Sequence, residues 1–148
     1  MNQLMKLVDH CVWANELWIR TIVQNWSSHE FVVARMSHIL HGERAWFDRV
    51  LGKEPSRDIW RALSTDSLWQ EHQRNRDLYN GTIGGDLDRV IQYKRFTGEE
   101  YQSPVSDILL HLTLHGTHHR GQMATYVSGK GSKPINTDYI QYCLLNRL

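Results

Sequence analysis

The stretch SPVSDILLHLTLHGTHHRGQMATYVS, residues 103–128, predicts one long helix and holds the densest group of histidines in the chain. Ser103 is suited to cap the start of this helix, and Pro104 fits its first position. Gly129 and Gly131 follow its expected end. Apolar side chains recur every three or four residues, which is the spacing of a helix with one buried face. They are Val105, Ile108, Leu112 and Met123.

Two histidines of this helix, His115 and His119, continue the apolar line and lie four positions apart. Positions four apart stack on one face of a helix, so both rings are expected to face the interior. A buried imidazole needs a partner, and two imidazoles so placed can converge on one metal ion. A buried histidine is also commonly just a hydrogen-bonded core residue, so the spacing leaves both interpretations equally open. A metal site would need at least one further ligand.

The third ligand is expected from SHILHGERAWF, residues 37–47, which lies in a second predicted helix. This segment offers His38 and His41. His38 shares a helix line with Gly42 and Ala45, whose small size lets another helix approach closely. His41 also has Ala45 as a near neighbour, so the spacing leaves the choice between the two histidines open. The repeated Glu-x-x-His pairs of a di-iron bundle are absent from the sequence, as is any recognisable Ser or Cys nucleophile motif.

The rest of the chain predicts further helices connected into a single domain over residues 1–148. Apolar periodicity favours helices at residues 3–24, 28–51, 65–80 and about 137–146. Alternating residues around Thr97-Gly98 predict a short hairpin within 89–103. The connection through Lys53-Glu54-Pro55 is long enough to cross over the molecule. We therefore predict an all-α fold, a four-helix bundle with a short hairpin before the fourth long helix.

Turn and capping residues set the expected helix ends. Ser27 and Glu30 resemble a capping box at the start of the second helix, and Gly52 is expected to end it. The other expected boundaries are a start at Ser64 or Thr65, a stop at Asn80-Gly81, and a cap of the last helix by Asn136 or Thr137.

Composition excludes several classes of function. Lys and Arg number 17 against 16 Asp and Glu, a formal net charge of +1, and this balance gives no nucleic-acid footprint. No apolar run is long enough to cross a bilayer, and the N-terminal stretch lacks a signal-peptide core. Cys11 and Cys143 form no CxxC motif, and we expect both to be reduced in the cytoplasm.

Four segments together resemble the DinB-like (damage-inducible) family of metal-dependent enzymes. They are VWANELW (12–18), SHILHGERAWFDRVLG (37–52), HLTLHGTHHRGQ (111–122) and NTDYIQY (136–142), and they occur in the order and spacing of that family. HGTHHRGQ is the most specific of them. The resemblance covers almost the whole chain.

The resemblance implies a bundle with up-down-down-up topology, with the long crossover between the second and third helices. It also implies a three-histidine site that binds zinc or nickel. The family's first ligand stands eight residues before a tryptophan, and Trp46 makes that residue His38 rather than His41. The other two ligands match His115 and His119. A homodimer is also implied.

The sequence gives the homodimer some support of its own. The chain has six tryptophans, and apolar residues cover more than one face of the second helix. Such a helix must bury more than one face, and a symmetric partner is a common way to do so. The alternative is that the hairpin and the last helix cover this surface within one chain.

Relatives in this family include transferases and isomerases that depend on bacillithiol, mycothiol or glutathione. The resemblance therefore implies a thiol-dependent transferase or isomerase acting on a small molecule, with a metal-assisted hydrolase as the closest variant. We expect Trp46 and Tyr126 to line the substrate pocket. Candidates for supporting the ligands or transferring protons are His41, His111 and His118. The alternative is a non-catalytic metal-binding or stress-response binding protein.

Overall fold

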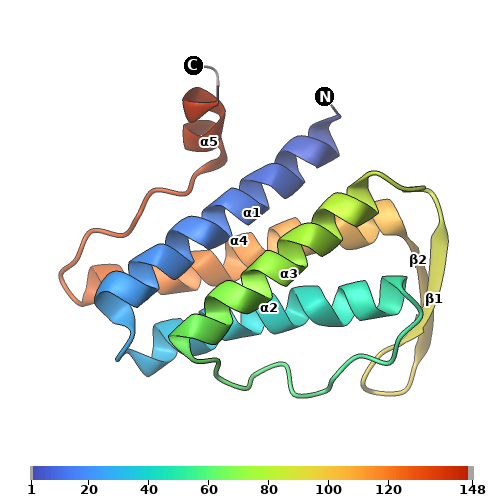
Figure 1. Ribbon diagram of the computed structural model, residues 1–148, viewed down its shortest axis with the longest axis horizontal. Coiled ribbons are helices and arrows are strands. Elements are labelled where there is room, and N and C mark those ends of the chain that lie inside the picture. The colour runs from blue at the N-terminus through green and yellow to red at the C-terminus, as the bar shows by residue number, and fades with distance from the viewer. Residues whose placement is uncertain (1, 147–148) are drawn as a thin grey trace.

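The computed structural model describes residues 2–146 and is mostly helical, with one small two-stranded sheet (Figure 1). The four long helices are α1 (Gln3–Thr21), α2 (Glu30–Val50), α3 (Thr65–Ile83) and α4 (Val105–Gly129). A π-helical segment, η1 (Ile22–Trp26), extends α1, and the short helix α5 (Tyr139–Leu145) follows α4. The prediction of a mostly helical fold with a short hairpin before the fourth long helix is confirmed at this level.

The long helices pack side by side, with α4 and α3 each lying against both α1 and α2. After α2 the chain returns along that helix as an extended segment before α3 begins (Figure 1). Consequently α2 and α3 run in the same direction. This returning segment contains Lys53-Glu54-Pro55, and we refer to it below as the crossover. None of the helices among the described residues is both long and apolar enough to cross a bilayer.

The hydrophobic core consists of two clusters at different levels of the four helices. The first contains Trp18 of α1, Met36 of α2 and Met123 of α4. The second contains Phe47 of α2 and Leu109 of α4. Each large apolar side chain of this kind stabilises the fold by about 1.5–3 kcal/mol on burial. On α4 the buried polar residues lie between the residues of the two clusters, and on α2 the buried His38 and Glu43 lie within and just after the stretch that forms the first cluster. The buried polar residues are therefore near the middle of both helices.

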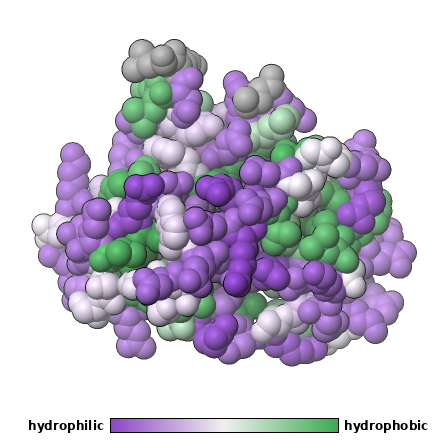
Figure 2. Space-filling model, viewed as in Figure 1, coloured by the Kyte–Doolittle hydropathy of each residue, from purple (hydrophilic) through white to green (hydrophobic). Residues whose placement is uncertain are grey.

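The helix α3 is the most polar of the long helices. It buries only Leu68, His72, Asn75 and Tyr79. Hydrophilic residues dominate the middle of the face seen in Figure 2, the side on which α3 lies. This face is therefore solvated.

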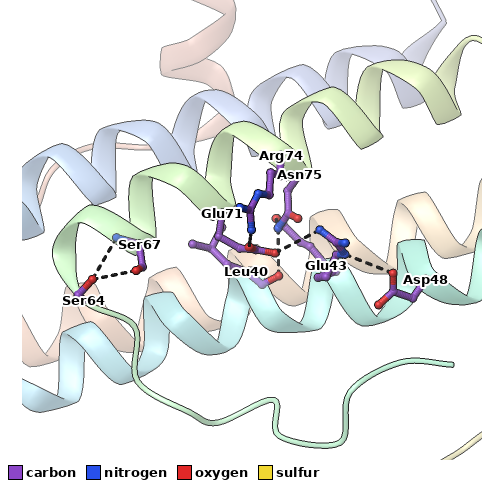
Figure 3. Close-up of polar contacts among 9 residues, drawn as sticks. Leu40, Glu43, Asp48, Ser64, Ser67, Glu71, Arg74 and Asn75 are labelled. Carbon is purple, nitrogen blue, oxygen red and sulfur yellow. Dashed lines mark hydrogen bonds and ion pairs between the residues drawn. The ribbon is translucent and has the colours of Figure 1, made fainter. Parts of the chain in front are cut away.

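Several predicted boundaries are confirmed. Ser64 caps α3, because its Oγ accepts a hydrogen bond from the Ser67 backbone N–H at 3.2 Å (Figure 3). Gly52 follows the end of α2 with a φ of 72°, a left-handed conformation that favours glycine. The hairpin pairs β1 (Val90–Lys94) with β2 (Glu100–Pro104) in antiparallel register.

Three predicted helix starts were wrong. The capping box does not form, since α2 begins at Glu30 after His29, with no side-chain cap. Ser103 belongs to β2, and Pro104 stands in extended conformation immediately before α4. The cap position of α5 is Asp138 rather than Asn136 or Thr137. In each case the preceding strand or loop, which has no helical pattern of its own, determines where the helix begins.

One predicted end was also wrong, because α3 continues through Gly81 to Ile83. A glycine inside a helix costs only about 1 kcal/mol relative to alanine. Ile83 packs against the second core cluster, and this burial offsets the cost.

Candidate metal centre

Three histidines from two helices converge at mid-height of the molecule. His38 comes from α2, and His115 and His119 come from successive turns of α4. One ring nitrogen of each lies within 4.8 Å of the others, and the Nε2 atoms of His38 and His115 are 3.2 Å apart. Tetrahedral zinc with bonds of about 2.0–2.1 Å to nitrogen requires ligand atoms roughly 3.4 Å apart. The cluster is therefore close to the geometry that a zinc-type ion needs.

Two of these rings are held in orientation by an acceptor on the side away from the cluster. His38 donates from Nδ1 to the carbonyl oxygen of Ile59 at 2.9 Å. His119 donates from Nδ1 to Oε1 of Gln122 at 2.8 Å. In a neutral imidazole a proton on Nδ1 leaves the lone pair on Nε2 free, so each bond fixes both the tautomer and the direction of the ligand atom.

The third ring, His115, fits because the residue opposite it has no side chain. A Cβ added at Gly42 of α2 would lie 3.0 Å from Cε1 of His115. Any larger residue at position 42 would therefore press on the ring. Gly42, which lies one turn after His38 on the same face of α2, therefore leaves room for the His115 ring of α4.

The surroundings of all three imidazoles lower their pKa and so favour the neutral form. Burial, together with the neighbouring histidines, lowers the pKa of His115 to about 3. Burial is also the main cause that lowers the pKa of His38 and that of His119. Neutral imidazole is the form that binds metal. The site is therefore ready to bind a cation near neutral pH without displacing protons from imidazolium groups.

The chain matches the DinB family over residues 1–146, which is nearly its whole length. The chain belongs to the DinB family. A search of curated proteins found no significant match. The resemblance drawn from the four sequence segments is thus confirmed at the level of the DinB family, and the cluster of three histidines fits a metal-binding member of it.

The remaining histidines of this DinB protein do different things. His41, the competing candidate, donates from Nε2 to the carbonyl oxygen of Arg61 at 2.9 Å and so holds the crossover rather than joining the cluster. His111 lies one turn from His115, with ring centroids 5.7 Å apart. His118 accepts a hydrogen bond from Nε2 of Gln122 at 3.3 Å. Gln122 thereby connects His118 to the orienting contact of His119.

The two predicted pocket residues lie on either side of the cluster along α2. Trp46 contacts His111, at a centroid distance of 5.4 Å. Tyr126 stacks on Phe31 at 4.8 Å. Neither is among the aromatic residues that contact the three histidines directly.

The aromatic residue that does so, Trp60, was missed by sequence analysis. Its ring stacks on His38 with centroids 3.6 Å apart and an interplanar angle of 7°. Trp60 belongs to the crossover, stays 49% exposed and also lies 6.1 Å from His119. No sequence pattern predicted this contact, because the path of an irregular segment has no periodicity.

A buried polar network centred on Glu43 lies on the inner side of α2 and was also missed. Its carboxylate accepts hydrogen bonds from Asn15 at 2.8 Å, Asn75 at 2.9 Å and Tyr79 at 3.2 Å (Figure 3 shows Asn75). Arg120 of α4 donates to Oδ1 of Asn15 at 2.6 Å. Burial raises the pKa of Glu43 to about 7. The network joins all four long helices and so fixes α2 and α4, which carry the three histidines of the cluster, relative to each other.

Proposed function

We propose that this protein is a metal-dependent enzyme that transfers a low-molecular-weight thiol to an electrophilic small molecule. The observation that carries the proposal is the composition of the cluster. Within residues 2–146 it contains three histidines and no fourth His, Cys, Asp or Glu. A structural zinc site is closed by four protein ligands, whereas a catalytic one keeps a position open. Three ligands therefore favour catalysis over a purely structural role.

The donor set fits zinc or nickel, since imidazole nitrogen suits both. His38, His115 and His119 would hold the ion, and the Ile59 carbonyl and Gln122 would keep two of these rings aimed at it. When bound, the metal would stabilise a thiol as thiolate near neutral pH. Trp60 covers one side of the site and limits the access of water to His38. The overall reaction would join the thiol sulfur to the electrophilic carbon, release the leaving group with the bonding electrons, and release the thiol proton to solvent.

Two measurements test this proposal. Elemental analysis of the purified protein should find about one divalent metal per chain. The metal-loaded protein should then accelerate thiol-dependent loss of chloride from monochlorobimane, while a His119→Ala variant should not. Metal-dependent ester hydrolysis without any thiol reaction would replace the transferase with the hydrolase variant. A metal-loaded protein that binds no thiol and turns over neither substrate would support the non-catalytic alternative.

We further propose the finer features that the family suggests. The four long helices form an up-down-down-up four-helix bundle, and the protein acts in the cytoplasm as a homodimer. Two free cysteines, Cys11 and Cys143, support a reducing compartment. The apolar faces of α2 do not themselves require a partner, because residues such as Met36 and Phe47 are buried within one chain. Exposed apolar side chains lie instead on α4 and α5, at Leu114, Ile140, Leu144 and Leu145.

A further inference from the structure

Two arginines of α2 have a buried Nε atom with no hydrogen-bond partner, Arg35 and Arg49. Among the described residues, neither has a carboxylate within ion-pair distance. By contrast, Arg44 on the same helix pairs with Asp48 at 3.2 Å and with Glu71 at 3.7 Å. An unpaired guanidinium that is partly removed from water is costly. The terminal Nη groups are not among these buried atoms, and through them such an arginine is a candidate for binding an anionic ligand.

Arg35 is placed directly beside the metal centre. It lies one turn before His38 on the same side of α2. Its guanidinium carbon is 4.9 Å from the Trp60 ring centroid and 4.7 Å from that of Phe31. Trp60 is the residue that stacks on His38 and approaches His119. The guanidinium of Arg35 therefore packs against Trp60, the same ring that stacks on His38.

The electrostatics agree with this placement. Burial is the first cause that lowers the pKa of both His38 and His119, and the positive charge of Arg35 contributes to lowering each of them. Arg35 is thus close enough to act on two of the three histidines. A positive charge with no carboxylate within ion-pair distance among the described residues therefore lies beside the histidine cluster.

Arg49 has the same unpaired character but a different location. It lies eleven residues after His38, about 16 Å along the helix at 1.5 Å per residue. Its guanidinium carbon packs 4.6 Å from the Trp46 ring centroid and 5.0 Å from that of Phe96, beside the hairpin. It is therefore a matched arginine that is too far away to meet a small ligand of the metal.

We propose that Arg35 binds the carboxylate of the small molecule that occupies the open metal position, so that the centre selects acidic thiols. This inference rests on the proposed thiol chemistry and names the class of thiol. A guanidinium can donate two parallel hydrogen bonds to a carboxylate, a geometry that lysine cannot reproduce. Packing between Trp60 and Phe31 holds the group in place before the ligand arrives, which reduces the entropic cost of binding.

The test compares thiols that differ only in their second group. Protein loaded with Co²⁺ is titrated with 3-mercaptopropionate, 2-mercaptoethanol and cysteamine, and binding is followed by the sulfur-to-cobalt charge-transfer absorption. The wild type should bind 3-mercaptopropionate about ten- to a hundredfold more tightly than 2-mercaptoethanol, the range expected for a charge-assisted hydrogen bond. It should bind cysteamine most weakly.

The variants isolate the contribution of Arg35. Arg35→Gln should abolish the preference for 3-mercaptopropionate and leave the affinity for 2-mercaptoethanol unchanged. Arg35→Lys should keep part of the preference, and the matched control Arg49→Gln should keep all of it. Circular dichroism and cobalt content establish that each variant is folded and loaded. An undiminished preference in Arg35→Gln would overturn the proposal, as would equal binding of the two thiols by the wild type.

A titration of the cobalt-loaded protein with acetate, which has a carboxylate and no thiol, separates failure of this proposal from failure of the proposed function. If no thiol alters the cobalt spectrum, the thiol chemistry is wrong. Acetate binding that perturbs the cobalt spectrum in the wild type and not in Arg35→Gln would then still support carboxylate recognition by Arg35. Acetate binding that is equal in both proteins would overturn it.

Discussion

Replacing Gly42 with alanine should separate metal affinity from fold stability. The new Cβ would lie 3.0 Å from Cε1 of His115, whereas ordinary contacts begin near 3.4 Å. The ring must therefore retreat by about 0.4 Å. Its Nε2 atom, bonded to Cε1, would move by a similar amount. Metal–ligand distances tolerate only about 0.2 Å, so the metal should be held poorly.

The expected loss of metal affinity is about 10- to 100-fold, the range seen when a residue that orients a ligand is removed. Stability should change little, because alanine gains up to about 1 kcal/mol of helix propensity over glycine and the displaced ring offsets part of it. Competition with a chromophoric chelator measures the metal affinity, and thermal denaturation followed by circular dichroism measures the stability.

Gly121 of α4 provides the matched control. A Cβ at that position would meet nothing within 4 Å. Gly121→Ala should therefore keep wild-type metal affinity and raise the midpoint of thermal unfolding by about 3 °C, which corresponds to about 1 kcal/mol for a chain of this size. If Gly42→Ala bound metal as tightly as Gly121→Ala, the close approach of α2 and His115 would not matter for the site, and the reasoning would fail.

The remaining predictions concern the ligands, the metal, the pH and the assembly. Alanine at any one histidine of the cluster should sharply reduce bound metal in elemental analysis, and His41→Ala should reduce it much less; the reverse result would mean that His41 is the ligand from α2. Chelation should lower the thermal midpoint but leave the helical circular dichroism intact, since the two core clusters do not depend on the ion; an unfolded chelated chain would indicate a structural metal. Burial lowers the pKa of His72 to about 4, so the folded state resists a proton that the unfolded state takes up below about 6.5. The contribution of His72 to the free energy of unfolding, measured by urea denaturation, should therefore be fully present above pH 6.5 and fall by up to about 3 kcal/mol towards pH 4. In His72→Leu the free energy of unfolding should fall less steeply with decreasing pH. An equally steep fall in the variant and the wild type would contradict this assignment. Sedimentation equilibrium should give twice the 17.4 kDa chain mass, and a constant mass of one chain would exclude the dimer.

Sequence periodicity predicted much of the fold and two thirds of the candidate cluster. The line of apolar residues in the fourth helix placed His115 and His119 on one buried face, and the structure has them there. This works because a helix repeats every 3.6 residues, so neighbours on a face can be deduced from local spacing alone. The hairpin and the cap at Ser64 were predictable for the same reason, since turn and capping chemistry acts over only a few residues.

The choice between His38 and His41 was not available from spacing. Both lie on faces of α2 that carry small residues, and only the rotation of α2 against α4 decides which ring meets His115. The resemblance to the family favoured His38, and the cluster of three histidines contains it. The structure adds the reason, because the crossover engages His41 through the Arg61 carbonyl and leaves His38 directed at the cluster.

The sequence by itself therefore determined the helices, the hairpin and the buried faces, all of which depend on interactions within a few residues. Only the tertiary structure decided what surrounds the histidine cluster: the Ile59 carbonyl, the stacked Trp60 and the unpaired Arg35. Two of these three, Ile59 and Trp60, belong to an irregular crossover, whose path has no period from which it can be deduced. Its position is set by the packing of all four helices together, and so are the contacts that orient the ligands and would select what binds beside them.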